Sequence, residues 1–370
     1  MSSEPGPEVG DEFPVTKTCT YLNHAAIAPW PRRTQEAVAR FALESAREGG
    51  RRVRQWADTE RQLRGQLAQF INAPSADDIA LQKNTSEALS VIAFGFPWQV
   101  GDNVVIAAEE FPSNRIVWEA LSDRGVGVRA VDLGAEADPE AALERACDSR
   151  TRLLSISSVQ YASGLRLDLV RLGDICRSRD VAFCVDAIQG LGAIAHDVQA
   201  MQADFLVADA HKWLLGPEGI AVFYCSARWR DRLRLNEYGW HMVEDPDNFD
   251  KRTWRVAASA RRFECGSPNR VGIHGLAASL SLLTEIGIAE IERRIAERAE
   301  CIVEAVRRRA ALELISSPDP RRRAGIVTFR HRRMDSLRLW HHLTARNVVC
   351  AVRAGGVRFS PHFYVPLAQL

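Results

Sequence analysis

Two short stretches decide the class of fold: residues 182–187 read AFCVDA, and residues 205–210 read FLVADA. Each is an almost unbroken apolar run that includes valine and reaches an aspartate near its end. This pattern is typical of a strand that is buried on both faces of a sheet. Four more runs of this kind lie at residues 104–108, 126–133, 153–159 and 220–225.

Segments with a helical spacing of apolar residues lie between several of these runs, at residues 113–124 and 167–179. A further helix is predicted from residue 31, where a proline opens the segment PRRTQEAVARFALESARE, because proline is favoured in a first helical turn. Buried strands that alternate with helices favour a parallel sheet covered on both faces. The sequence therefore predicts an α/β fold.

Beyond residue 234 the pattern changes. Residues 235–258 are polar and rich in aromatic side chains without a clear period, which predicts a long loop. Residues 288–311 have a strong helical spacing with dense Glu/Arg pairs. A strand at 326–330, a helix at 336–346 and strands near 348–352 and 357–359 follow. We therefore expect a large domain over residues 12–284 and a small C-terminal α/β domain over residues 285–370.

The composition is that of an ordinary globular enzyme, with 46% apolar and 26% charged residues among 370. A net charge of +1 gives no general electrostatic case for binding nucleic acid or an anionic membrane. No apolar run approaches the roughly 18 residues needed to span a bilayer, and the acidic, polar N-terminus does not resemble a secretory signal. The eight cysteines contain no CxxC pair, so we expect reduced thiols in a cytoplasmic protein and no metal site.

Lysine is rare in this chain, with four residues at positions 17, 83, 212 and 251. Lys212 alone follows closely on a predicted buried strand and precedes a glycine-rich turn, LGPEG at 215–219. Asp186 ends the preceding strand, 26 residues upstream, so both residues would lie at the carboxyl edge of the sheet, where ligands bind. Either residue alone also suits an ordinary strand end. Together they are what pyridoxal 5′-phosphate (PLP) needs, namely a Schiff-base lysine and an acid beside the pyridine nitrogen.

A phosphate group needs backbone donors at a helix start and nearby hydroxyls. The segment NTSEAL at residues 84–89 supplies both before an apolar helix, although an ordinary helix cap would look the same. Residues 190–195 (GLGAIA) match the G-x-G-x-x-A dinucleotide fingerprint. Only about a dozen residues separate this motif from the next strand, which is too few for the usual crossover helix, so a nicotinamide cofactor is disfavoured.

These residues resemble the class V aminotransferase family of fold-type-I PLP enzymes, which includes cysteine desulfurases, selenocysteine lyases and isopenicillin-N-epimerase-like proteins. The resemblance runs from YLNHAA at 21–26 to VRFSPHFY at 357–364. Its most specific motifs are VDAIQG at 185–190, ADAHKWLLGPEG at 208–219 and RRFECGSPN at 261–269. It implies a large domain with a mainly parallel sheet of the seven-stranded type, a small C-terminal α/β domain, and PLP as cofactor.

The resemblance also implies roles for individual residues. Lys212 would form the Schiff base and then move the Cα proton, and Asp186 would pair with the pyridine nitrogen. Ser267 would reach the phosphate from a neighbouring subunit, which implies a homodimer with shared active sites. The substrate amino acid would be contacted by Asn23, His24 and Arg358, with the N-terminal segment 1–30 partly covering the site. The full set of implied cofactor contacts is Thr85, Ser86, Phe111, Gln160, Asp186, Gln189, Asp209, His211, Lys212 and Ser267.

Two positions and one loop depart from the desulfurase pattern. Phe111 stands where desulfurases have histidine, and Asp209 stands where they have a hydroxyl residue. The catalytic cysteine loop is absent from the short segment VRAGGVR at 352–358, and the nearby Cys350 falls in a strand-like run. We therefore expect Cα chemistry through an external aldimine, ending in transamination or in C–S/C–X bond cleavage. Sulfur transfer of the desulfurase type, epimerisation, condensation and a non-catalytic scaffold remain alternatives.

Overall fold

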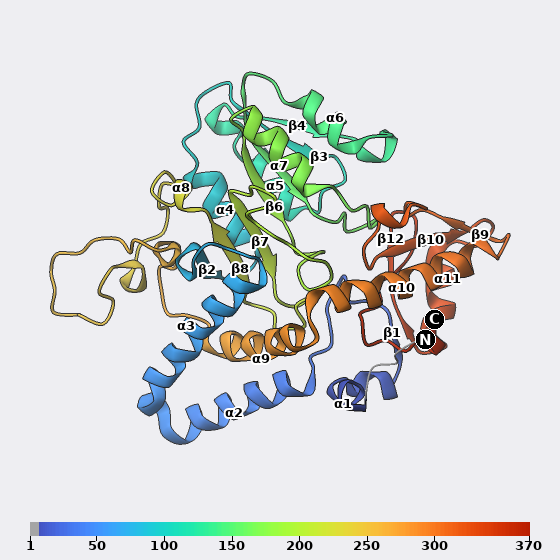
Figure 1. The fold of residues 1–370 in the computed structure, drawn as a ribbon, viewed down its shortest axis with the longest axis horizontal. Helices are drawn as coiled ribbons and strands as arrows, with labels where there is room; N and C mark the ends of the chain where they lie inside the picture. The colour runs from blue at the N-terminus through green and yellow to red at the C-terminus, as the bar shows by residue number, and fades with distance from the viewer. Residues whose placement is uncertain (1–6) are drawn as a thin grey trace.

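The computed structural model describes residues 7–370, and its centre is a seven-stranded sheet (Figure 1). The order of strands is β2-β8-β7-β6-β5-β3-β4. Strands β4, β3, β5, β6 and β7 run parallel to one another, whereas β8 is antiparallel to both of its neighbours. The strands are β2 (Ile79–Gln82), β3 (Asn103–Ala107), β4 (Gly127–Val131), β5 (Thr151–Ser157), β6 (Ala182–Asp186), β7 (Phe205–Asp209) and β8 (Ala221–Cys225).

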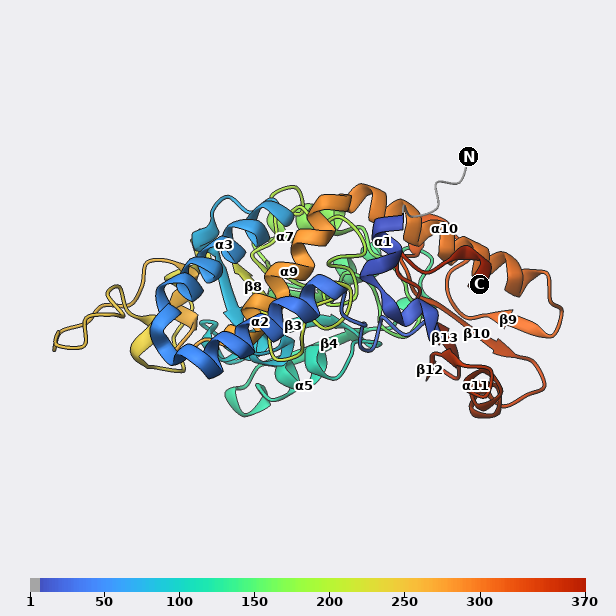
Figure 2. The same ribbon diagram turned by 90° about the horizontal axis from the view of Figure 1, so that it is seen from below.

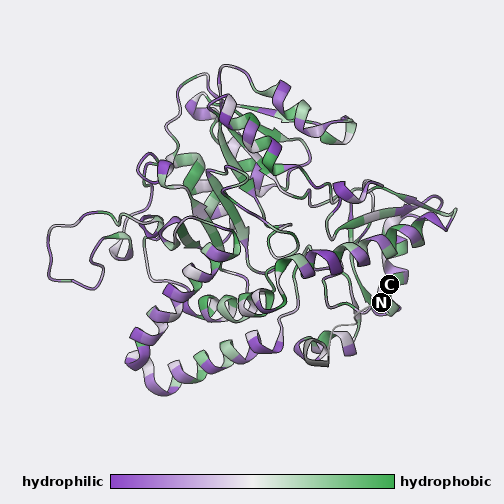
Figure 3. Ribbon diagram, viewed as in Figure 1, coloured by the Kyte–Doolittle hydropathy of each residue, from purple (hydrophilic) through white to green (hydrophobic). Residues whose placement is uncertain are grey.

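Helices cover both faces of this sheet, and the strands alternate their side chains between two apolar cores. In β7, Phe205 and Val207 lie in one core while Leu206 and Ala208 lie in the other. This alternation explains why the strands are apolar throughout, as their hydropathy in Figure 3 shows. One face is covered by α3 (Val53–Phe70), α6 (Pro139–Ala146), α7 (Leu169–Ser178) and α9 (Arg270–Ile286), and the other by α4 (Thr85–Gly95) and α5 (Ser113–Glu119). Helix α2 (Arg32–Glu48) packs on α9.

A second, four-stranded antiparallel sheet in the order β12-β13-β10-β9 forms the C-terminal region with its own apolar core. Its elements are α10 (Ile288–Arg307), β9 (Leu312–Leu314), β10 (Val327–His331), α11 (Ser336–Thr344), β12 (Ala351–Arg353) and β13 (Gly356–Phe359). Gly287, with a φ of 85°, separates α9 from α10 next to the predicted domain boundary. The two helices bend by 83° there.

The start of the described chain joins this C-terminal region. Strand β1 (Thr20–Tyr21) pairs in parallel with β11 (Val348–Val349), and Asn23 bridges to Ser360. Part of the segment predicted to cover the site, residues 1–6, lies outside the described residues.

Across residues 7–370 no single helix has both the length and the apolar composition to cross a membrane, although the bent pair α9 and α10 meets that test jointly.

Some elements differ from the sequence predictions. Helix α3 and strand β2 were not predicted, and β8 is antiparallel within a sheet predicted to be mainly parallel. No helix connects β6 to β7, in agreement with the argument against a dinucleotide site. The predicted loop 235–258 holds only one short turn of 3-10 helix, Trp240–Met242, and projects from the body at the end opposite to the second sheet (Figures 1 and 2).

Candidate active site

Three strand ends bring the predicted site residues together at the carboxyl edge of the sheet. Asp186 is the last residue of β6, and Lys212 follows β7 by three positions. The Lys212 side chain is buried, with 7% of its residue surface exposed, and its Nζ lies 5.4 Å from the centre of the Phe111 ring. Phe111 comes from the segment after β3. An aromatic face and a buried amine therefore border the same space.

Burial lowers the pKa of the Lys212 amine, because the interior disfavours its charged form. The carboxylate of Asp186 acts in the opposite direction, and the positive charges of Arg358 and Arg353 lower the pKa of Lys212 further. A larger share of unprotonated amine results at neutral pH than in an ordinary lysine. This is the state in which a lysine attacks an aldehyde.

Asp186 is a deeply buried carboxyl group with unused hydrogen-bonding capacity. It is 1% exposed, and it accepts one hydrogen bond within the described chain, from Ile188 N at 3.2 Å. Burial raises the pKa of Asp186, and the neighbouring Glu110 raises it further. A protonated ring nitrogen placed against this group would reverse that shift by supplying the missing charge partner. The group therefore fits the pyridine nitrogen of PLP.

Glu110 is a member of the site that the sequence analysis missed. It is buried, and its carboxylate accepts hydrogen bonds from Ser157 N, Ser157 Oγ and Gln160 Nε2, the last at 3.0 Å. Gln160 Oε1 is buried without a partner, so the amide is held at its nitrogen and offers its oxygen to a ligand. A carboxylate just beyond an apolar strand was the signal that revealed Asp186, and the same signal was present at Glu110.

The start of α4 forms the candidate phosphate site. Thr85 N donates to Asp209 Oδ2 at 3.1 Å, and Asp209 N donates to Thr85 Oγ1 at 3.1 Å. Ser86 is exposed and its N–H, in the first helical turn, has no acceptor within the helix. His211 Nδ1 is buried without a partner, and burial lowers the pKa of His211 to about 4. Ser86 and a neutral His211 therefore remain as donors. The Thr85 N–H is already bonded to Asp209, so Thr85 can contribute only its hydroxyl hydrogen.

Arg358 lies on the wall formed by the second sheet. It is 1% exposed, and Nη1 donates to Tyr161 O at 2.7 Å, while Nε has no partner. The Tyr161 ring meets the Phe111 ring edge-on, with centroids 5.2 Å apart. Burial, and then the charge of Arg353, lowers the pKa of Arg358 to about 10, so it stays charged at neutral pH. The edge formed by Nε and Nη2 is open to a carboxylate.

Both ring nitrogens of His24 have partners within the described chain, and its contact with a substrate stays a prediction. His24 is 0% exposed, its Nδ1 donates to Ser360 O at 2.8 Å, and its Nε2 lies 2.7 Å from Tyr364 Oη. Its side chain ties the N-terminal segment to the residues that follow β13. Asn23 Oδ1 is buried without a partner and is free for a ligand.

Gln189 lies between two protein groups rather than facing only a ligand. It donates to Ala25 O at 3.0 Å and accepts from Trp213 Nε1 at 3.0 Å. The other amide hydrogen is the group left to interact with a cofactor ring.

Ser267 is exposed, whereas Lys212 is buried. Ser267 lines a surface hollow of about 320 Å³ together with Lys83, Glu87 and Cys265, next to the start of α4. The hollow opens to solvent, so a second chain could reach it.

One cluster of possible metal ligands occurs among residues 7–370, outside the candidate active site. Ligand atoms of Glu60, His241 and Glu264 lie within 4.8 Å of one another. Arg64 already binds both glutamates, with Nη2 2.7 Å from Glu60 Oε1 and Nη1 2.6 Å from Glu264 Oε1. Because this guanidinium occupies the carboxylates, the cluster is a buried ion-pair network that anchors the base of the 235–258 loop.

Comparison with known proteins agrees with this geometry. The family model described as aminotransferase class-V matches residues 20–363. A protein named probable cysteine desulfurase from Methanothermobacter thermautotrophicus is 30% identical over 96% of this chain and 93% of its own length. A cysteine desulfurase from Pectobacterium carotovorum is 31% identical over 84% of this chain and 77% of its own length.

Solved structures agree as well. The apo structure of a cysteine desulfurase from Thermococcus onnurineus superposes with a TM-score of 0.90 at 25% identity, covering 100% of this chain and 96% of that one. The cystine C–S lyase C-DES in complex with cysteine persulfide gives a TM-score of 0.91 at 21% identity, covering 96% of each chain, and supports the fold. The chain belongs to the class V aminotransferase family, and it is a PLP-dependent enzyme of fold type I.

Proposed function

We propose that this enzyme acts at the Cα of an amino acid, with transamination or C–S/C–X bond cleavage as the outcome. One observation carries the proposal: the buried Lys212 amine lies over the Phe111 ring, and Asp186 ends the neighbouring strand. Bound PLP supplies an aldehyde for an amine and a ring that accepts electrons from the Cα. The chain itself then has to hold the cofactor, bind the substrate carboxylate and move one proton.

Each of these tasks has a candidate residue. Lys212 is the covalent attachment point and afterwards the base that takes the Cα proton, a role that its lowered pKa supports. Arg358 binds the α-carboxylate through its open edge. Asp186 keeps the ring nitrogen protonated. Around the rest of the cofactor we propose Thr85, Ser86, Phe111, Gln160, Gln189, Asp209 and His211.

The same relatives make sulfur transfer the second candidate, since their names are those of cysteine desulfurases. Such transfer requires a nucleophilic thiolate near the substrate. Cys350 is the cysteine nearest to Arg358 in sequence, but it is packed in the core of the second sheet, and burial raises its pKa to about 11. Two residues only, Ala354 and Gly355, connect β12 to β13. Because Cys350 is buried and the hairpin is this short, we favour bond cleavage without sulfur transfer to Cys350.

We further propose a homodimer in which Ser267 reaches the phosphate of the partner's cofactor, and a division of the chain into domains 12–284 and 285–370. The exposure of Ser267 beside the start of α4 supports the first proposal. The separate core of the second sheet and the break at Gly287 support the second. The pairing of β1 with β11 ties the N-terminal segment to the smaller domain.

The test is the absorption spectrum of the purified protein with PLP, before and after each amino acid is added. Wild type and Lys251→Ala should show the yellow band of a lysine-bound cofactor, and Lys212→Ala should not. Conversion to the pyridoxamine spectrum would identify transamination. Return of the band with release of keto acid and ammonia would identify elimination. A yellow, fully active Lys212→Ala variant would disprove the assignment of Lys212.

A further inference from the structure

The β12–β13 hairpin carries a second arginine beside Arg358. In its antiparallel register Ala351 pairs with Arg358 and Arg353 pairs with Gly356. Paired residues share a face of a sheet, as do residues two apart in a strand, so Arg353 and Arg358 lie on one face as diagonal neighbours. Such neighbours are about 7–8 Å apart between their Cα atoms, within reach of long side chains.

This face is the one that looks toward the active site. Arg358 Nη1 donates to Tyr161 O at 2.7 Å. Thr328 of β10 is the strand partner of Arg358, and its hydroxyl donates to Ala162 O at 2.6 Å. Arg353 is fixed on the same face by a two-residue turn whose residues, Ala354 and Gly355, have φ values of 49° and 69°. The turn and the pairing register together set the position of Arg353 beside Arg358.

The two arginines differ in what surrounds them. Arg358 is buried, whereas Arg353 is exposed at the rim and donates only to the backbone oxygen of Val352, at 2.7 Å. Within residues 7–370 no carboxylate lies close enough to Arg353 to form an ion pair. Its charge nevertheless acts on both the Arg358 guanidinium and the Lys212 amine. The two arginines together thus carry one more positive charge than a single α-carboxylate requires.

We propose that Arg353 is a specificity-determining residue that binds a second anionic group, on the substrate's side chain. The enzyme then selects amino acids with a side-chain carboxylate over neutral ones. This inference rests on the proposed function, in which Arg358 takes the α-carboxylate. Arg353 meets the second anion at the rim, where its fork geometry gives a bidentate, charge-assisted contact.

The test compares ligands that differ only in the second charge. Binding of succinate and of propionate to the PLP-loaded enzyme is measured by calorimetry, and kcat/KM is measured for aspartate, glutamate and alanine. Arg353→Gln should weaken the binding of succinate by about 10- to 100-fold, because a charge-assisted contact is lost. It should reduce kcat/KM for aspartate and glutamate by a similar factor. Propionate binding and kcat/KM for alanine should stay within about threefold. Arg309→Gln, an exposed arginine after α10, is the matched control and should change neither.

Other outcomes separate the two proposals. If Arg353→Gln weakens the binding of succinate and of propionate equally, or weakens neither, Arg353 does not bind a second anion and the inference is wrong. If Arg358→Lys leaves propionate binding unchanged, the carboxylate assignment in the proposed function is wrong. Folding of each variant is checked by the yellow band with PLP, which none of these substitutions should remove.

Discussion

At the scale of single residues, the proposed role of Asp186 makes its charge depend on the cofactor. In the cofactor-free chain its carboxyl group is buried without a cationic hydrogen-bond partner, and its pKa is raised. In its proposed place beside the ring nitrogen of PLP, it has to be ionised to hold a proton on the ring. Asp186→Asn keeps the shape but loses this charge, so we expect kcat/KM to fall by about 100- to 1,000-fold, the usual cost of breaking a buried charge pair. The yellow band should remain, because Lys212 is intact.

Although its activity should fall, the cofactor-free Asp186→Asn variant should be at least as stable as the wild type. A carboxyl group whose pKa is raised by folding costs stability as the pH rises above the unfolded value, near 4. At pH 8 the variant should therefore unfold at the same temperature as wild type or higher. A lower melting temperature without cofactor would show that Asp186 stabilises the apo fold. Asp123→Asn, an exposed position, serves as control.

At the scale of elements, the proposed phosphate site at the start of α4 lies against the carboxylate of Asp209, the last residue of β7. Asp209 accepts a hydrogen bond from Thr85 N where the phosphate is proposed to bind. An ionised Asp209 would repel the phosphate, so Asp209→Asn should tighten PLP binding by about tenfold, the effect of roughly 1.4 kcal/mol. Equilibrium dialysis against PLP at pH 8 measures this. Weaker binding would mean instead that a protonated Asp209 donates to the phosphate, which burial, by raising its pKa, would favour.

His24 holds the N-terminal segment to the residues that follow β13, and this contact should be sensitive to acid. Burial lowers the pKa of His24 to about 3, whereas an unfolded histidine titrates near 6.5. The unfolded chain therefore takes up the proton first, and stability is lost as the pH falls below about 6.5. From pH 7 to pH 5 this one residue should cost about 2 kcal/mol.

Urea unfolding of the cofactor-free protein at both pH values measures that loss. His24→Asn should be less stable than wild type at pH 7, because the contact with Tyr364 is gone, but it should lose about 2 kcal/mol less between pH 7 and pH 5. His342→Asn, on the exposed side of α11, should behave like wild type. An unchanged pH dependence in His24→Asn would contradict the role assigned to His24.

Elements buried on two faces were predictable from the sequence, and those whose identity depends on pairing were not. The runs of β5, β6 and β7 are apolar throughout because helices cover both sides, so they stand out without any structure. Strand β2 has only four residues. Strand β8 would need the same apolar sequence whether it ran parallel or antiparallel to β7. In the site, Asp186 was found because it ends such a strand, and Lys212 because it follows one by three residues. Arg353 was not found, because only the hairpin register places it on the face of Arg358.

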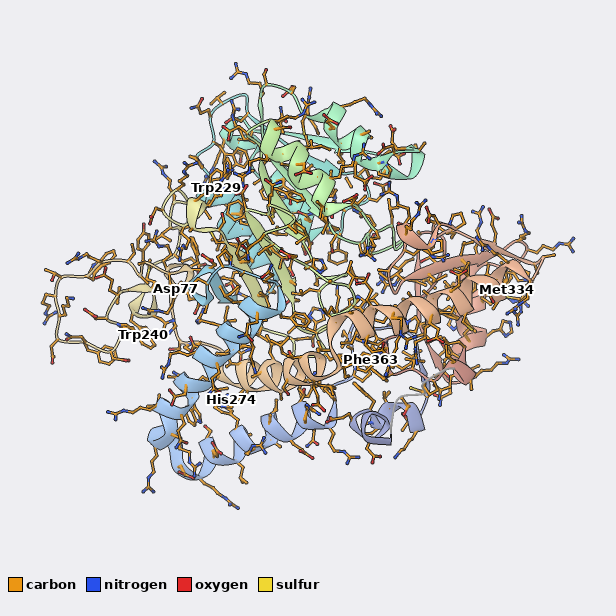
Figure 4. The ribbon with its side chains drawn as sticks, in the orientation of Figure 1. Asp77, Trp229, Trp240, His274, Met334 and Phe363 are labelled. Atoms are coloured by element: carbon orange, nitrogen blue, oxygen red, sulfur yellow. The ribbon has the colours of Figure 1, made fainter. Side chains whose placement is uncertain are left out.

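At the scale of the whole molecule, the exposed surface suggests a second chain. The 235–258 loop extends away from the body, and Trp240 lies on it in Figure 4. The aromatic side chains of this loop are largely in solvent, at 41–77% exposure: Tyr238, Trp240, Phe249 and Trp254. A group of exposed aromatic residues marks an interaction surface. The base of this loop contacts the segment that carries Ser267, because the backbone oxygen of Cys265 accepts from His241 N at 3.3 Å.

If two chains share their active sites, two inactive variants should restore activity when they form mixed dimers. Lys212→Ala removes the lysine, and Ser267→Asp places a negative charge against the partner's phosphate. In a mixed dimer one site carries both lesions and the other carries none. Co-expression in equal amounts should therefore recover about a quarter of wild-type activity, since half of the dimers are mixed and each has one intact site. If Ser267 acted on its own chain's cofactor, every site in a mixed dimer would carry one lesion and no activity would return. Full activity of the Ser267→Asp homodimer would rule out any contact with the phosphate.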